Sequence, residues 1–131
     1  MESGGGSMVI NAADQCYAGK PHSFGYGLPK GALGRITKSL AIDLGPKDVR
    51  GNAVYAGTIR TPLTEKLFQS VADITHGGDA SACWRTEAGR YPLGRVGETL
   101  EVAELMCFLA SDAASFMTGT LYLVDGGLTA G

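Results

Sequence analysis

The chain has 131 residues, of which 44% are hydrophobic and 18% charged, and its formal net charge at pH 7 is −2. This length suits one small domain with a modest core, and the composition is typical of a soluble globular protein. A slightly acidic balance argues against a nucleic-acid partner, and no apolar run approaches the roughly 20 residues that cross a bilayer.

The first predicted elements are a strand and a long helix. The apolar run Ser7–Asn11 (SMVIN) follows the glycines Gly4–Gly6, which predicts a short buried strand. Residues Tyr26–Leu44 carry apolar side chains at helical spacing. Gly45 and Pro46 then supply a stop signal, so the helix is expected to end at Leu44.

The second part of the chain continues the alternation of strands and helices. Asn52–Tyr55 predicts a buried strand, Thr64–Val71 a short helix, Thr99–Ala110 a longer helix and Leu121–Val124 a third strand. The polar stretch Asp73–Arg90 lacks periodicity and is expected to be a mobile loop or lid. The order predicts an α/β protein with a mainly parallel sheet of about three strands.

Cysteine and histidine residues give no sign of a metal site. Cys16, Cys83 and Cys107 have no paired ligand spacing, and an odd number of widely spaced cysteines suits a reduced chain. His22 and His76 lack companion ligands and are expected in surface loops. The amino-terminal segment has no secretory pattern, so a cytoplasmic protein is expected.

The segment Tyr26-Gly27-Leu28-Pro29-Lys30 carries the functional prediction. Tyrosine and lysine four residues apart project from the same face of a helix. A nearby ammonium favours the phenolate, so the tyrosine can exchange a proton nearer neutral pH, as carbonyl reduction by a nicotinamide requires. The pentapeptide alone also fits a half-buried Tyr26 and a solvated Lys30 without catalytic roles.

The surrounding segments extend the match. The strand SMVIN comes before the motif, and KGALGRITKSLAIDLGP, VRGNAVYAGTIRTPL and PLGRVGETLEVAELMCFLASDAASFMTGTLYLVDGG follow it. This ordered set resembles the second half of the short-chain dehydrogenase/reductase family. The resemblance implies a single partial domain over residues 1–131, with a doubly wound, Rossmann-like parallel sheet. It also implies NAD(P)(H)-dependent interconversion of small alcohols and carbonyl compounds.

The resemblance implies roles at matching positions. Tyr26 matches the catalytic acid/base, and Lys30 matches the lysine that lowers the tyrosine pKa and hydrogen-bonds the nicotinamide ribose. The expected cofactor-binding residues are Lys30, Gly57, Thr58, Ile59 and Thr61. In the last segment the backbone of Ile59 would contact the nicotinamide carboxamide. Glycine at position 57 would let the backbone approach a ligand closely, although a simple turn glycine fits equally well.

The family's nucleotide fingerprint has no counterpart in this sequence. Gly4–Gly6 leads into a strand and does not open a helix, so it cannot hold a pyrophosphate in the usual way. The nucleotide-binding half is therefore expected to be missing, and with it the residue that selects NAD or NADP.

Two further departures affect the predicted catalytic residues. The positions that match the family's catalytic serine hold Ala12 and Ala13, which have no hydroxyl. Pro29 is disfavoured inside a helix but tolerated in its first turn. The helix could therefore start near Leu28 and leave Tyr26 outside it.

These departures leave three functional hypotheses. The first is an oxidoreductase that is inactive as the isolated chain and acts only when another polypeptide supplies the nucleotide-binding half. The second is a non-catalytic remnant or interaction module that forms a homo-oligomer or pairs with a full-length relative. The third is a complete enzyme whose gene start has been misassigned.

Overall fold

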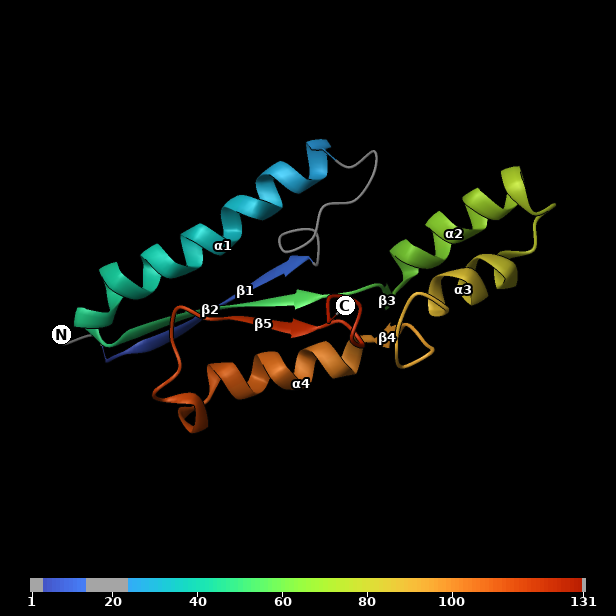
Figure 1. Ribbon diagram of the computed structural model, residues 1–131. Coiled ribbons are helices and arrows are strands. Elements are labelled where there is room, and N and C mark those ends of the chain that lie inside the picture. The colour runs from blue at the N-terminus through green and yellow to red at the C-terminus, as the bar shows by residue number, and fades with distance from the viewer. Residues whose placement is uncertain (1–3, 14–23, 131) are drawn as a thin grey trace.

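The computed structural model describes residues 4–13 and 24–130, and the side chains of residues 4–12 and 32–130 (Figure 1). The elements in chain order are β1 (Gly6–Ala13), α1 (Phe24–Leu44), η2 (Gly45–Lys47), β2 (Val49–Ala56), β3 (Ile59–Arg60), α2 (Pro62–Thr75), α3 (Ala80–Ala88), β4 (Gly97–Glu98), α4 (Thr99–Ala110), η3 (Asp112–Ala114) and β5 (Leu121–Val124).

The main sheet has the order β1-β2-β5, and both pairings are parallel. Ile10 lies opposite Ala53, and Ala53 lies opposite Leu121. Helix α1 covers one face of this sheet and α4 covers the other (Figure 1). The predicted α/β class and the three predicted strands are therefore confirmed.

Strand β2 is buried on both faces because it lies at the centre of the sheet. Ala53 and Tyr55 pack with Ala12 on the α1 side. Val54 packs with Leu109 on the α4 side. A strand covered on both faces reads as a continuous apolar run, which is why the sequence identified it.

A glycine allows α1 to lie close to the sheet. A Cβ added at Gly34 would lie 2.7 Å from the Tyr55 hydroxyl oxygen. Tyr55 is fully buried beneath the helix, so its ring occupies the space that a side chain at position 34 would need.

Polar side chains of β2 hold the end of α4 and the approach to β5. Arg50 donates to the carbonyl oxygens of Leu109, at 2.8 Å, and Ser111, at 3.0 Å. A cation at the carboxyl end of a helix satisfies carbonyl groups that have no partner within the helix. Buried Asn52 donates to the carbonyl of Met117 at 2.7 Å and accepts from the Thr120 amide at 3.2 Å.

The segment expected to be irregular contains a helix, so that prediction was wrong. Asp79 caps α3 by accepting a hydrogen bond from the Ser81 amide. The rings of Phe68 on α2 and Trp84 on α3 contact edge to face, with their centroids 4.3 Å apart. Capping and this contact stabilise a helix whose sequence lacks a clear apolar stripe.

Helices α2 and α3 together, residues 62–88, are called the α2–α3 unit, and a second, two-stranded sheet lies where the chain enters it. Strands β3 and β4 pair in parallel, with Ile59 opposite Gly97. Two-residue strands are too short to give a periodic sequence signal, and neither was predicted. Within the residues that the structure describes, no helix is long and apolar enough to span a membrane.

Candidate functional site

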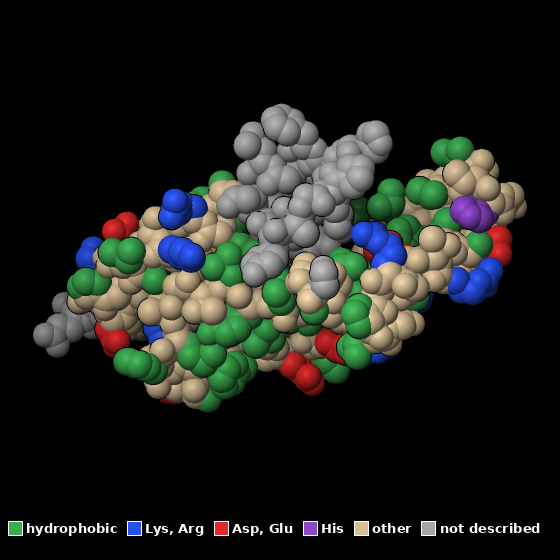
Figure 2. All heavy atoms as spheres, viewed as in Figure 1, with side chains coloured by type: hydrophobic (Ala, Val, Ile, Leu, Met, Phe, Trp, Pro, Cys, Tyr) green, Lys and Arg blue, Asp and Glu red, His purple; other side chains and the backbone are tan. Residues whose placement is uncertain are grey.

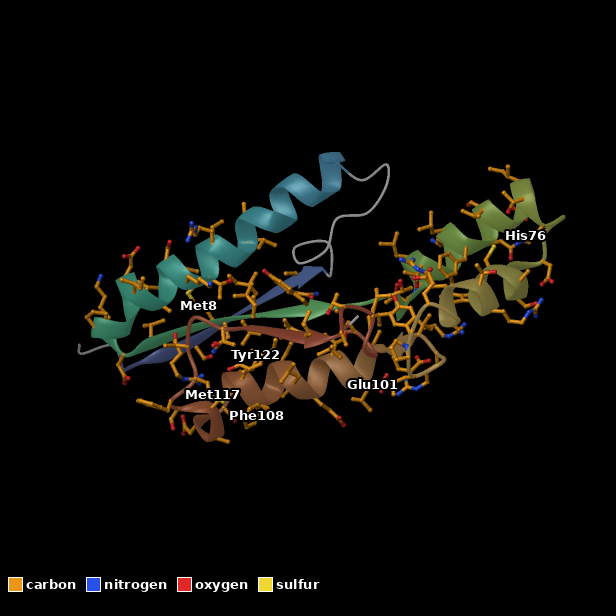
Figure 3. All side chains as sticks on the ribbon, viewed as in Figure 1. Met8, His76, Glu101, Phe108, Met117 and Tyr122 are labelled. Carbon is orange, nitrogen blue, oxygen red and sulfur yellow. The ribbon has the colours of Figure 1, made fainter. Side chains whose placement is uncertain are left out.

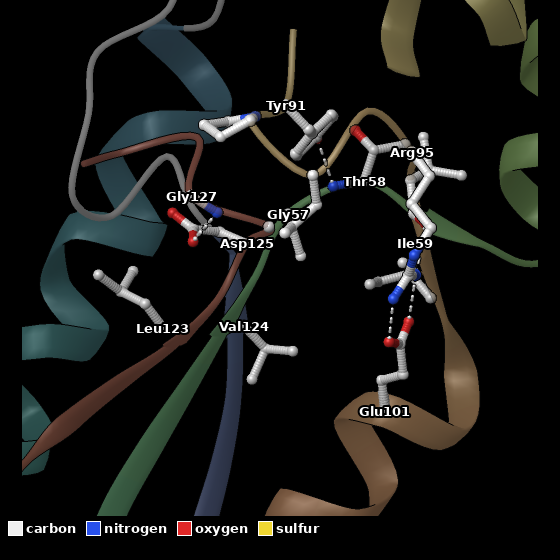
Figure 4. Close-up of a pocket in the computed structure, with 15 residues that line it drawn as sticks. Gly57, Thr58, Ile59, Tyr91, Arg95, Glu101, Leu123, Val124, Asp125 and Gly127 are labelled. Carbon is white, nitrogen blue, oxygen red and sulfur yellow. Dashed lines mark hydrogen bonds and ion pairs between the residues drawn. The ribbon is translucent and has the colours of Figure 1, made fainter. Parts of the chain in front are cut away.

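The candidate site lies where the parallel strands end. In open α/β sheets, ligands bind beyond the carboxyl ends of the strands. A pocket of about 420 Å³ occupies this position, between the ends of β2 and β5 and the segment that leads into β4 (Figure 4). Its apolar wall includes Ile59, Leu123 and Val124.

Three of the predicted cofactor-binding residues line this pocket. Gly57, Thr58 and Ile59 come directly after β2 and form one side of it. Thr61 has a different role, because its hydroxyl accepts from the Thr64 amide at 3.2 Å and caps α2. The structure thus brings residues 57–59 together at the pocket and places the Thr61 side chain at the start of the next helix.

Gly57 is enclosed by protein atoms on the side where a Cβ would project. An added Cβ would lie 3.0 Å from Cε1 of Tyr91 and 3.2 Å from the Cα of Asp125. The close approach at this glycine is therefore to Tyr91 and to the end of β5. Tyr91 is 5% exposed and was missed by the sequence analysis.

A hydrogen-bond network surrounds Thr58. The Thr58 amide donates to the Tyr91 hydroxyl oxygen at 2.8 Å, and the Thr58 hydroxyl donates to Oε1 of Glu87 at 2.6 Å. The Tyr91 hydroxyl donates to the same carboxylate oxygen at 3.2 Å. Burial raises the pKa of Glu87, but hydrogen bonds from Thr58 and Arg90 outweigh it, and the pKa is lowered.

The opposite wall of the pocket is held by Asp125. Its carboxylate accepts from the Gly127 amide at 3.0 Å and from the amide and hydroxyl of Thr129 at 3.0 and 2.6 Å. Burial raises the pKa of Asp125, but the Thr129 and Gly127 hydrogen bonds lower it further than burial raises it. Asp125 therefore fixes the turn after β5 as a carboxylate.

An ion pair lies on the α4 side of the pocket. Nη2 of Arg95 lies 2.6 Å from Oε1 of Glu101, and these side chains are drawn in Figure 4. The hydrogen bond from Arg95 and the Glu98 amide lower the pKa of Glu101 to about 2. The three charged side chains that the described residues place on the pocket wall all have partners, so the pocket presents mainly apolar surface and backbone groups.

The predicted catalytic pair lies in one helix. Helix α1 begins at Phe24, so both Tyr26 and Lys30 are helical, and the alternative start near Leu28 is wrong. Pro29 costs one backbone hydrogen bond inside the helix without ending it. The side chains of Tyr26 and Lys30 lie outside the described residues. The first turn of α1 lies on the side of the sheet where the strands end (Figure 1).

The two positions that match the family's serine lie at the end of β1. Ala12 is buried and packs beneath α1 with Tyr55 and Leu33. The Ala13 side chain lies outside the described residues. At position 12 the alanine therefore fills the core.

Histidine and cysteine lie together far from this pocket. Nδ1 of His76, at the end of α2, is 3.7 Å from Sγ of Cys83 on α3, and Figure 3 shows His76 at the outer end of the α2–α3 unit. Among the described residues, no group of three or more potential ligands is placed to hold a metal ion.

Comparison with known proteins gives matches along the whole chain. The family model described as enoyl-(acyl carrier protein) reductase matches residues 1–129. A 2-keto-3-deoxy-L-fuconate dehydrogenase from Xanthomonas campestris is 38% identical over 97% of the chain and 41% of its own length. A trans-4-hydroxycyclohexanecarboxylate dehydrogenase from Sinomonas cyclohexanicum is 36% identical over 100% of the chain and 44% of its own length.

Solved structures agree with the fold. A short-chain dehydrogenase family protein from Francisella tularensis superposes with a TM-score of 0.92 at 44% identity, covering 95% of the chain and 51% of that protein. An L-sorbose reductase from Gluconobacter frateurii, solved with NADPH and L-sorbose, gives a TM-score of 0.91 at 29% identity over 96% of the chain and 48% of that protein. The chain thus spans about half the length of these relatives.

Proposed function

The chain belongs to the short-chain dehydrogenase/reductase family, and from this premise we propose that it carries the acid/base and nicotinamide side of an oxidoreductase site. The reaction would interconvert a small alcohol and a carbonyl compound with NAD or NADP. The observation that carries this proposal is the pocket beyond the strand ends, which Gly57, Thr58 and Ile59 line.

The proposed chemistry divides between cofactor and protein. When bound, NAD(P)H supplies the hydride. Tyr26 would hold a proton at its phenolic oxygen for the carbonyl oxygen of the substrate. Lys30, one helical turn later in α1, would favour the phenolate by its charge and donate to the nicotinamide ribose.

The pocket has a chemistry that fits the nicotinamide end of such a cofactor. A flat ring can pack against Ile59 and Val124, and a carboxamide can reach backbone groups at Ile59. Thr61 caps α2 and is included because the family resemblance implies a place near the cofactor. Lys30, Gly57, Thr58, Ile59 and Thr61 are therefore the proposed cofactor-binding residues.

The proposed substrates are small hydroxylated or keto compounds. The names of the relatives describe dehydrogenases of a keto-deoxy sugar acid and of a hydroxycyclohexanecarboxylate, and a reductase of L-sorbose. The α2–α3 unit follows directly after the proposed cofactor loop, and its residues would help to select among such compounds.

We further propose that the 131-residue chain alone does not turn over substrate. Its sequence has no glycine-rich turn that opens a helix after a strand, so adenosine and pyrophosphate would lack their usual site. Alanine at positions 12 and 13 also leaves the substrate carbonyl without the family's serine hydroxyl. Activity would then require the nucleotide-binding side from residues outside these 131, either in the same polypeptide or in a second one, in the cytoplasm.

A test separates the two ends of the cofactor. Backbone amide shifts of the labelled chain are followed while nicotinamide mononucleotide (NMN) or AMP is added. We expect NMN to shift the amides of residues 57–61 in a saturable way and AMP to leave them unchanged. Absence of any NMN response in a folded sample would contradict the proposal.

A second candidate function is assembly, and the outer edge of β1 favours it. In the described part of the chain, β1 pairs with β2 along one edge, and its other edge has no partner strand over its eight residues. A long free edge is a template for strand pairing. Figure 2 also shows hydrophobic side chains gathered on the face over β5 and α4. Two large hydrophobic residues of this part of the chain are exposed, Phe108 on α4 and Phe116 after η3.

Sedimentation velocity over a range of concentrations tests this candidate. Met8 lies on β1 and is 41% exposed, so Met8→Lys places a charge at the edge without disturbing the core. A wild-type dimer that dissociates in the Met8→Lys variant would support assembly through β1. A monomer at all concentrations would exclude self-association and leave pairing with a full-length relative.

A further inference from the structure

Thr58 is held through its amide, carbonyl and hydroxyl groups by the last turn of α3 and the segment that follows it. Its amide donates to Tyr91, its hydroxyl donates to Glu87, and its carbonyl accepts from the Gly97 amide at 3.0 Å. These partners lie 29 to 39 positions later in the chain. The position of the loop after β2 is therefore set by residues at the end of α3 and after it.

The Tyr91 ring is fixed between two strand ends. A Cβ added at Gly57 would lie 3.0 Å from Cε1 of the ring, and one added at Gly126 would lie 3.2 Å from Cδ1. Glycine at both positions makes room for the ring. The amide of Leu93 donates to the Gly126 carbonyl at 3.2 Å, which ties the segment after Tyr91 to the end of β5.

Glu87 gives this arrangement a charged centre. Its Oε1 accepts from the Thr58 and Tyr91 hydroxyls, and its Oε2 lies 2.9 Å from Nη1 of Arg90. Hydrogen bonds to an ionised carboxylate are stronger than those between neutral groups. The carboxylate orients both hydroxyls, so that the Tyr91 oxygen is free to accept from the Thr58 amide.

We propose that Tyr91 and Glu87 are positioning residues that hold the loop Gly57–Ile59 in the shape that receives the nicotinamide end of the cofactor. The inference rests on the proposed function, because it assigns the loop to the cofactor. Neither residue touches the reacting atoms in this scheme. Both act through Thr58, whose backbone is continuous with the Ile59 groups proposed to meet the carboxamide.

Two substitutions remove the network while keeping the packing. Tyr91→Phe keeps the ring between the glycines and removes the acceptor for the Thr58 amide. Glu87→Gln keeps the shape of the side chain and removes its negative charge. Tyr122→Phe, on β5, and Glu104→Gln, on the exposed face of α4, make the same chemical changes away from the loop and serve as matched controls.

Two readouts follow the loop directly: hydrogen exchange of the Thr58 amide and the dissociation constant for NMN from amide shifts. Losing one hydrogen bond of ordinary net strength changes an equilibrium by about fivefold. We expect Thr58 exchange about fivefold faster and NMN binding about fivefold weaker in Tyr91→Phe, with a similar loss in Glu87→Gln. The controls should stay within about twofold of the wild type.

The outcomes separate this inference from the proposed function. If the wild type binds NMN and both loop variants bind it equally well, the positioning inference is wrong and the proposed function stands. If the wild type gives no NMN response, the proposed function and the inference fall together. Should Tyr91→Phe unfold, as far-UV circular dichroism would show, the Glu87→Gln variant decides the question.

Discussion

Replacing Gly57 by alanine tests the packing at the base of the pocket. The new Cβ would lie 3.0 Å from Cε1 of Tyr91, 3.3 Å from its hydroxyl oxygen and 3.2 Å from the Cα of Asp125. Neither neighbour can move away easily. Tyr91 is buried and hydrogen-bonded. The end of β5 is joined to Gly57 because the Gly57 amide donates to the Val124 carbonyl at 3.0 Å.

Overpacking of this kind costs about 1–3 kcal/mol of unfolding free energy. For a chain of this length that corresponds to a fall in Tm of roughly 3–15 °C. Thermal unfolding followed by circular dichroism measures the change. Gly45→Ala is the matched control, because among the described residues an added Cβ there meets nothing within 4 Å. It should be neutral or slightly stabilising.

A double-mutant cycle identifies the cause. In a Tyr91→Ala background one of the two close neighbours of the added methyl is gone. The double variant should therefore be more stable than the sum of the single effects predicts, by about 0.5 kcal/mol or more. Additive effects, or an unchanged Tm for Gly57→Ala, would refute the argument that Tyr91 requires glycine at this position.

Three further predictions concern stability. Leu109→Ala removes a side chain that is fully buried and should lower the unfolding free energy by about 2–5 kcal/mol in urea titrations. Arg50→Met removes donors to the carbonyls of Leu109 and Ser111, and should cost about 1–3 kcal/mol, whereas an unchanged urea midpoint would contradict the capping role. The lowered pKa of Asp125 stabilises the fold above the carboxyl's ordinary pKa of about 4, and this contribution is lost as pH falls through the folded-state value. Wild-type stability should therefore fall in acid more steeply than that of Asp125→Asn, which is already weakened at neutral pH because an amide matches the Thr129 donors less well.

Strong local patterns allowed much of the fold to be predicted from the sequence. Leu121–Val124 and Thr99–Ala110 were predicted with the boundaries that the structure has. Both lie against the apolar core, where burial imposes a clear pattern on the sequence. Helix α3 was missed because its sequence, ASACWRTEA, has no clear apolar stripe, although Asp79 before it and Gly89 after it were signals of a cap and an end.

The candidate site was only partly predictable. Residues 57–59 follow a strand directly, so a family resemblance could assign them to the strand ends. The contacts of Thr58 with Glu87 and Tyr91 join positions that are 29 and 33 residues apart, and no local pattern indicates them. Gly57 was expected either to let the backbone approach a ligand closely or to be a simple turn glycine, and the structure shows that Tyr91 occupies the space beside it.

Saturation-transfer NMR with NADH tests the central claim most directly, because it shows which end of the cofactor contacts the protein. If the chain carries only the nicotinamide side of the site, the nicotinamide protons should receive saturation and the adenine protons should receive little. Unlabelled NMN should suppress this signal and AMP should leave it unchanged. Strong saturation of the adenine protons, or none on either ring in a folded sample, would contradict the account.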